Sequence, residues 1–172
     1  MSRLILLSVY KKNMVFFRYL LNAKWRFFPP KKNKYVLVDG SYNPFSKYIN
    51  KKNITILYRR GEEVNLFILL KCFLKFKFNT LDYCKNFILH VSPKLILTAF
   101  EYHSIFYKLS RSTGIKTVML QKGKRSPTEE IIYNSNKFFP KNSKNKFFVD
   151  YFFVYNKKAK EFYNKKINGK YF

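Results

Sequence analysis

The fold is decided by residues 92–123, which read SPKLILTAFEYHSIFYKLSRSTGIKTVMLQKG. Residues 94–100 form a continuous apolar run, which is typical of a strand buried on both faces of a parallel sheet. Residues 102–112 follow with the pattern of a helix, and Gly114 stands where a helix commonly ends in a left-handed residue. A second apolar run at 115–120 completes a strand–helix–strand unit, so two parallel strands joined by a helix are expected.

The same alternation continues on both sides of this unit. We expect further strands at 35–38, 54–58 and 149–155, and further helices at 64–78, 81–91 and 157–165. The helix at 64–78 is apolar on most faces and is expected to be largely buried. Together these elements predict a single α/β domain with a Rossmann-like, mainly parallel sheet, right-handed crossovers and helices on both faces.

The length of 172 residues suits one domain, and the N-terminal part differs from the rest in composition. Residues 1–28 form a basic, aromatic segment that Pro29-Pro30 closes, which leaves 29–172 as the Rossmann-like domain. Two interpretations of the segment are open. It is an interfacial helix whose Arg18 and Lys24 meet lipid headgroups, or it is an arm packed on the domain.

The charge of the chain is extreme, with 35 basic against 9 acidic side chains and a net charge of +26. Such a charge attracts nucleic acid or the anionic face of a membrane. However, Lys outnumbers Arg by 28 to 7, and Lys, Asn, Phe, Tyr and Ile are all residues of A/T-rich codons. Arg is the residue that grips phosphate bidentately. We therefore attribute the charge mainly to compositional drift and solvation, with a functional polyanion or lipid surface as the alternative.

The two cysteines, Cys72 and Cys84, lie in apolar stretches without any Cys/His spacing that would predict a metal site. Buried thiols in a reducing cytoplasm are expected. The sequence shows no secretory signal and no apolar stretch long enough to span a bilayer. A cytoplasmic protein without a metal is predicted, with the inner face of the membrane as a further location.

Polar residues collect directly after the expected strands, where parallel strands bring their carboxyl ends to one edge of the sheet and open α/β folds bind ligands. The candidate binding residues are Asp39, Gly40, Arg60, Glu62, Gln121, Lys122, Gly123 and Arg125, and the candidate catalytic residues are Glu101 and His103.

Each of these positions has a structural alternative. Asp39-Gly40 is either part of a site or only a turn. Arg59 and Arg60 either grip a phosphate or pair with the neighbouring acidic residues Glu62 and Glu63.

His103 and the segment after 120 have alternatives too. His103 is either a general base near a helix N-terminus or a structural histidine. Gly123 follows a buried strand, so backbone amides there can approach an anion that Lys122 or Arg125 neutralises. The segment is nevertheless neither a dinucleotide fingerprint nor a phosphate-binding loop.

The order of six segments resembles a family of bacterial surface-carbohydrate or lipopolysaccharide biosynthesis proteins, which are similar to glycosyltransferases of the two-Rossmann-domain (GT-B) architecture. The likeness covers most of residues 25–170 and rests on YVLVDG at 35–40, RGEEVNL at 60–66, SPKLILT at 92–98, FYKLS at 106–110, QKGKR at 121–125 and VDYFFVYN at 149–156. It departs at Glu101-Tyr102, where the family has Asp-Asn, and at Lys122, where it has Asn. Family members also continue with a second domain, whose first strand is expected near Gly169.

The resemblance implies a glycosyltransferase-like N-terminal domain that uses a nucleotide-sugar donor, binds no cofactor tightly and gives little transfer alone. Glu101 or His103 would deprotonate an acceptor hydroxyl, while Gln121, Gly123 and Arg125 would hold a sugar or an anion. The implied partners are a sugar or lipid-linked acceptor, a separate C-terminal half-domain and the anionic membrane surface, rather than nucleic acid. The alternative is a non-catalytic basic module that binds an anionic membrane or nucleic acid.

Overall fold

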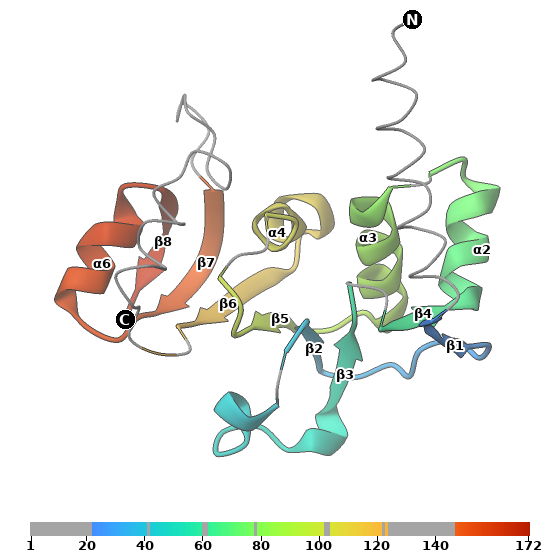
Figure 1. The fold of residues 1–172 in the computed structure, drawn as a ribbon, viewed down its shortest axis with the longest axis horizontal. Helices are drawn as coiled ribbons and strands as arrows, with labels where there is room; N and C mark the ends of the chain where they lie inside the picture. The colour runs from blue at the N-terminus through green and yellow to red at the C-terminus, as the bar shows by residue number, and fades with distance from the viewer. Residues whose placement is uncertain are drawn as a thin grey trace, which may run out of the picture.

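Six parallel strands form one sheet in the computed structural model, which describes residues 22–40, 42–59, 62–77, 79–101, 104–121, 123 and 147–172 (Figure 1). Every pairing between neighbouring strands of this sheet is parallel. The predicted α/β fold with a Rossmann-like parallel sheet is therefore confirmed. The strands run in the order β3 (Ile54–Leu57), β2 (Tyr35–Val38), β5 (Leu95–Thr98), β6 (Lys116–Leu120), β7 (Phe147–Phe153) and β8 (Ile167–Tyr171).

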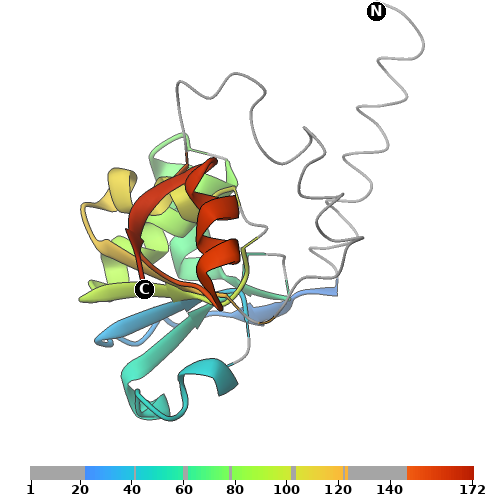
Figure 2. The ribbon, with the colours of Figure 1, turned by 90° about the vertical axis from the view of Figure 1, so that its left-hand side faces the viewer.

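The strand order reverses once, at β2. From β2 the chain moves outward to β3, then returns to the other side of β2 for β5 and continues in that direction. Right-handed crossovers in opposite directions lie on opposite faces of a sheet. The β2–β3 connection, with the 3₁₀ helices η1 (Asn43–Phe45) and η2 (Lys51–Asn53), accordingly lies below the sheet in Figure 2, and the α-helices lie above it.

The two faces of the sheet carry separate cores because side chains alternate along each strand. Val36, Ile96 and Met119 face the α-helices and share the larger core with them. Leu37 and Leu97 face the other way and pack with Phe45 of η1. The helices of the larger core are α2 (Leu66–Leu74), α3 (Thr80–Val91), α4 (Phe106–Thr113) and α6 (Lys157–Asn164).

Two helix ends show how local residues set these boundaries. The side chain of Asn79 caps α3 by accepting from the backbone N–H of Asp82 at 2.9 Å, so the helix begins one residue before the expected start at 81. Gly114 ends α4 in the left-handed region at φ 73°, as predicted. The first residues expected in this helix, 102 and 103, lie outside the described residues.

The prediction of a single helix at 64–78 is wrong. Its first residues belong to β4 (Glu63–Asn65), which pairs in parallel with β1 (Lys24–Arg26) as a separate two-stranded sheet. Asn65 ends the strand and starts α2, because its side chain accepts from the N–H of Ile68 at 3.1 Å. The expectation of a largely buried helix is also wrong, since only Ile68 and Cys72 of α2 are buried.

The last strand, β8, was not expected from the sequence. Its residues Asn168, Gly169 and Lys170 break the apolar pattern, because β8 forms an edge of the sheet and faces solvent. The C-terminal residues therefore complete this sheet, although the resemblance placed the start of a second domain there. Gly169 lies against the neighbouring strand so closely that a Cβ would overlap the carbonyl oxygen of Val149.

Replacing Gly169 by Ala should therefore push β8 away from β7. We expect Gly169→Ala to lower the free energy of unfolding by about 1–3 kcal/mol, as for other overpacked positions. Urea unfolding measures this change. Asn168→Ala, at an exposed position of the same strand, is the matched control, and equal stabilities of the two variants would contradict the close approach.

Both cysteines are buried, as predicted, and both are free. Burial raises the pKa of the Cys84 thiol to about 12, and burial also raises the pKa of the Cys72 thiol. Because only the thiolate attacks a disulfide reagent, both thiols should react slowly in the native protein. We expect Ellman's reagent at pH 8 to modify them at least about tenfold more slowly than in urea. Rapid reaction of either thiol in the native protein would show that its surroundings open readily.

Candidate functional site

Four neighbouring strands bring polar residues to one edge of the sheet, here called the rim. Arg59 follows β3, Asp39 follows β2, Glu101 follows β5 and Gln121 follows β6. Because these strands are parallel, the residues that follow them lie on the same side of the molecule. The rim includes the reversal of strand order between β2 and β5, where open α/β sheets bind their ligands.

Several candidates lie outside the part of the chain that the structure describes. These are Arg60, His103, Lys122 and Arg125, so their roles stay predictions. Among the described candidates, Glu62 is exposed, and Gly40 and Gly123 are half-buried.

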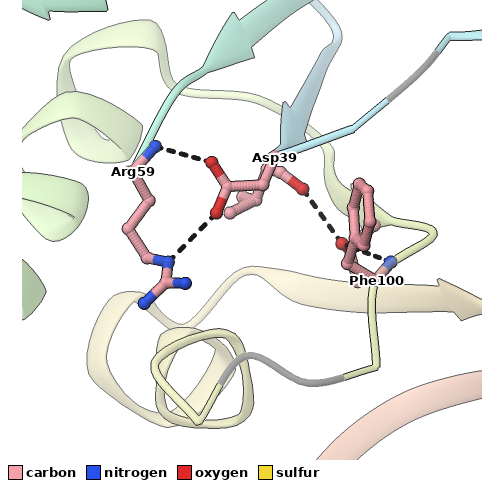
Figure 3. A network of polar contacts seen from close by, with 5 residues as sticks. Asp39, Arg59 and Phe100 are labelled. Atoms are coloured by element: carbon pink, nitrogen blue, oxygen red, sulfur yellow. Dashed lines mark hydrogen bonds and ion pairs between the residues drawn. The ribbon is translucent and has the colours of Figure 1, made fainter. Parts of the chain in front are cut away.

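Asp39 joins the loops after β2 and β3. Its carboxylate accepts from the backbone N–H of Arg59 at 2.7 Å and from the Arg59 Nε at 3.0 Å (Figure 3). The Asp39 side chain is almost fully buried, and its backbone adopts a left-handed φ of 39°. Asp39 is thus more than a turn residue. Arg59 pairs across two strands with Asp39 and not with the neighbouring acidic residues, while Glu63 pairs with Arg26 at 2.9 Å. The same alternative for Arg60 lies outside the described residues.

The reversal point itself is lined by Gly40 and Phe100. Thr98 donates from its Oγ1 to the carbonyl of Val38 at 2.9 Å and accepts from the N–H of Phe100 at 3.1 Å (Figure 3). The Phe100 ring lies against Gly40, where an added Cβ would approach the ring to 3.1 Å. Gly40 also has a φ of 146°, which side chains disfavour. A ligand at the reversal point therefore meets an aromatic ring and glycine backbone.

Glu101 connects the rim to two helices. Its carboxylate accepts from the hydroxyl of Tyr163 in α6 at 2.7 Å, and its backbone carbonyl accepts from the hydroxyl of Tyr107 in α4 at 2.7 Å. The Glu101 residue is 7% exposed, and Tyr163 is fully buried. Sequence reasoning missed both tyrosines. Tyr163 lies 62 residues from Glu101, and a Lys-rich helix gives no signal of such a contact.

Gln121 holds the turn after β6 against the end of β7. Its side-chain amide donates to the carbonyl of Gly123 at 3.0 Å and accepts from the N–H of Tyr155 at 2.9 Å. Both ends of the amide are therefore engaged by backbone. Gln121 fixes the position of Gly123, whose backbone was the expected anion contact.

A second buried network, also missed, lies within the sheet around Asp150 of β7. One carboxylate oxygen, Oδ2, accepts from the Ser110 hydroxyl at 2.8 Å, the Thr117 N–H at 2.8 Å and the Thr117 hydroxyl at 2.9 Å. These contacts join α4 and β6 to β7. Asp150 therefore anchors this part of the fold.

A hollow of about 770 Å³ lies along the edge strand β3. Trp25, Phe28 and Tyr58 contribute aromatic walls, and Arg26 and Lys52 contribute positive charge. None of the candidate site residues lines it. The hollow and the rim are therefore two separate features.

Scans of protein-family models, curated proteins and solved structures gave no match to this chain. Within the described ranges, no cluster of three or more His, Cys, Asp or Glu residues is placed to hold a metal ion. No described helix has both the length and the hydrophobicity that crossing a bilayer requires.

The Asp39–Arg59 contact should stabilise the rim. In Asp39→Asn an amide NH₂ or a neutral oxygen replaces the carboxylate oxygen that Arg59 Nε contacts, so the loops after β2 and β3 lose their ion pair. We expect the free energy of unfolding to fall by about 1–3 kcal/mol, as measured by urea denaturation. Glu161→Gln removes the same charge at an exposed site of α6 and should change stability by less than about 0.5 kcal/mol. Similar effects of both variants would contradict the anchoring role of Asp39.

Proposed function

We propose that the chain is a glycosyltransferase-like domain of bacterial surface-polysaccharide or lipopolysaccharide biosynthesis. The observation that carries the proposal is the rim, where Asp39, Glu101 and Gln121 follow three neighbouring parallel strands around the reversal of strand order. Ligands of open α/β folds bind at such a reversal. The order of the six sequence segments supplies the link to sugar chemistry.

In the proposed reaction an acceptor hydroxyl attacks the anomeric carbon of a nucleotide-sugar. A bond forms between the acceptor oxygen and that carbon, the bond to the diphosphate breaks, and the diphosphate leaves with the electron pair. Glu101 or His103 takes the hydroxyl proton. The Tyr163 hydroxyl, which donates to Glu101 at 2.7 Å, holds this carboxylate in place.

The charged residues near the end of β6 suit the leaving diphosphate. Lys122 and Arg125 carry positive charge next to Gly123, and hydrogen bonds to charged groups contribute about 1.5–3 kcal/mol each. Gln121 fixes the backbone of Gly123. Phe100 offers a ring on which a base or a sugar can stack.

Nucleotide binding tests the site. We expect the full chain to bind nucleoside diphosphates at physiological salt, and Lys122→Gln with Arg125→Gln to weaken binding about tenfold or more. Isothermal titration calorimetry measures both affinities. Lys108→Gln with Arg111→Gln removes the same charge from exposed positions of α4 and should weaken binding less than about threefold, the effect of net charge alone. No binding, or equal weakening by the two pairs, would overturn the proposal.

The same proposal predicts which residue serves as the base. In an assay that supplies a C-terminal half-domain, nucleotide-sugars and lipid extract as acceptor, glycosyl transfer followed by mass spectrometry should fall about a hundredfold or more in Glu101→Gln or in His103→Ala. Tyr163→Phe removes the hydrogen bond to Glu101 but leaves the carboxylate. Comparing its transfer rate with that of Glu101→Gln distinguishes the effect of a misplaced base from the effect of a missing base. Unchanged transfer in both base variants would rule out these roles.

A further inference from the structure

One face of α2 exposes large apolar side chains. Leu70, Phe73 and Leu74 follow one another at the spacing of a single helical face, and Phe76 stands just beyond the helix end. Leu74 is 76% exposed and Phe76 is 83% exposed. Soluble proteins rarely expose such contiguous apolar surface without an interaction partner. We call residues Leu70, Phe73, Leu74 and Phe76 the α2 face.

The opposite side of α2 fixes the helix on the domain. Ile68 and Cys72 enter the larger core, and the Asn86 amide of α3 donates to the Cys72 sulfur at 3.4 Å. Lys71 Nζ lies 3.4 Å from Nδ1 of His90. Burial and then the charge of Lys71 lower the pKa of His90. α2 is therefore anchored on α3, and it lies at one end of the fold (Figure 1).

Phe76 occupies a position that its own backbone disfavours. It adopts a left-handed φ of 52°, and the N–H of Lys77 bonds back to the carbonyl of Cys72 at 3.0 Å. Gly or Asn normally fills this position at a helix end, because a side chain with a bulky Cβ substituent is strained there. Phe76 neither relieves backbone strain nor fills the core, so packing within the described fold does not account for it.

The charges around the α2 face are positive. Lys75 and Lys77 are exposed beside Phe76, and Lys71 lies one turn before Lys75. The acidic residue nearest in sequence is Asp82, whose carboxylate accepts from the Asn79 amide at 2.6 Å and whose backbone N–H donates to the Asn79 side chain at 2.9 Å. Apolar side chains flanked by lysines on one helix are typical of segments that lie at the interface of an anionic bilayer.

We propose that the α2 face docks on an anionic lipid surface, with Leu70, Phe73, Leu74 and Phe76 at the boundary between headgroups and acyl chains. Lys75 and Lys77 then contact lipid phosphates. A net charge of +26 disfavours a second copy of the chain as the occupant and favours an anionic surface. Leucine side chains have no contact to gain on phosphate backbones, which favours lipid over nucleic acid. This inference does not depend on the proposed transferase activity.

Vesicle flotation with the full chain tests the docking. Binding is expected to vesicles of phosphatidylglycerol and phosphatidylcholine in equal parts, and not to phosphatidylcholine alone. Leu74→Asn with Phe76→Asn should weaken the binding about tenfold or more, because burial of each apolar side chain shifts a binding constant by about that factor. Asn tolerates the left-handed backbone at 76, so the fold should survive the change. Tyr48→Asn, at an equally exposed aromatic residue of the β2–β3 connection (83%), is the matched control and should bind as the wild type does.

A second pair of variants tests the charges. Lys75→Gln with Lys77→Gln should weaken binding more than Lys51→Gln with Lys52→Gln, which removes two exposed lysines from η2. Failure of the wild type to float with anionic vesicles overturns the proposal. So does equal binding of the wild type and the Leu74→Asn, Phe76→Asn variant, because charge alone would then explain the attraction. A dimer in gel filtration that this variant converts to a monomer, without vesicle binding, assigns the α2 face to a second copy instead.

Discussion

The parallel pairing of β2 with both β3 and β5 is the constraint on which the rest of the structure depends. Because β2 has parallel neighbours on both sides, the chain connects β2 to β3 in one direction across the sheet and β3 to β5 in the opposite direction. The connections then fall on opposite faces, which separates the small core around Phe45 from the larger helical core. The same constraint places the reversal at the rim, where the Phe100 ring packs against Gly40.

At the rim, the polar residues that the sequence draws attention to also hold the fold together. Asp39 is bonded to Arg59, Glu101 to Tyr163, and the Gln121 amide to backbone on both sides. Buried polar groups need such partners, because each unsatisfied one costs free energy. A transferase site here would use this network as its support, with the contacts to phosphate made by the basic residues that follow β6. The network therefore gives the rim the rigidity that a catalytic base requires.

The central strands could be predicted from the sequence because buried parallel strands have continuous apolar runs, as at 94–100 and 115–120. The strands β4 and β8 could not be predicted in this way. Glu63 and Asn65 interrupt the apolar pattern of β4, and Asn168 and Gly169 interrupt that of β8. Both strands form because they pair with other segments of the chain. The rim residues could be predicted because polar residues directly follow the apolar runs of the strands. Their partners were missed because a contact such as Glu101 with Tyr163 depends on how α6 packs, which no local pattern records.

α2 shows a different reason why a sequence-based prediction fails. A largely apolar helix is buried only where other elements pack around it. α2 packs mainly on α3. α3 in turn packs on β3, the strand that Arg59 follows. The α2 face and the rim are thus connected through α3 and β3. If α2 lies on a bilayer, the packing of α2 on α3 and of α3 on β3 fixes the height of the rim above that bilayer. An acceptor anchored in the lipid would then meet the rim at a set distance, so docking would select acceptors by the reach of their headgroups.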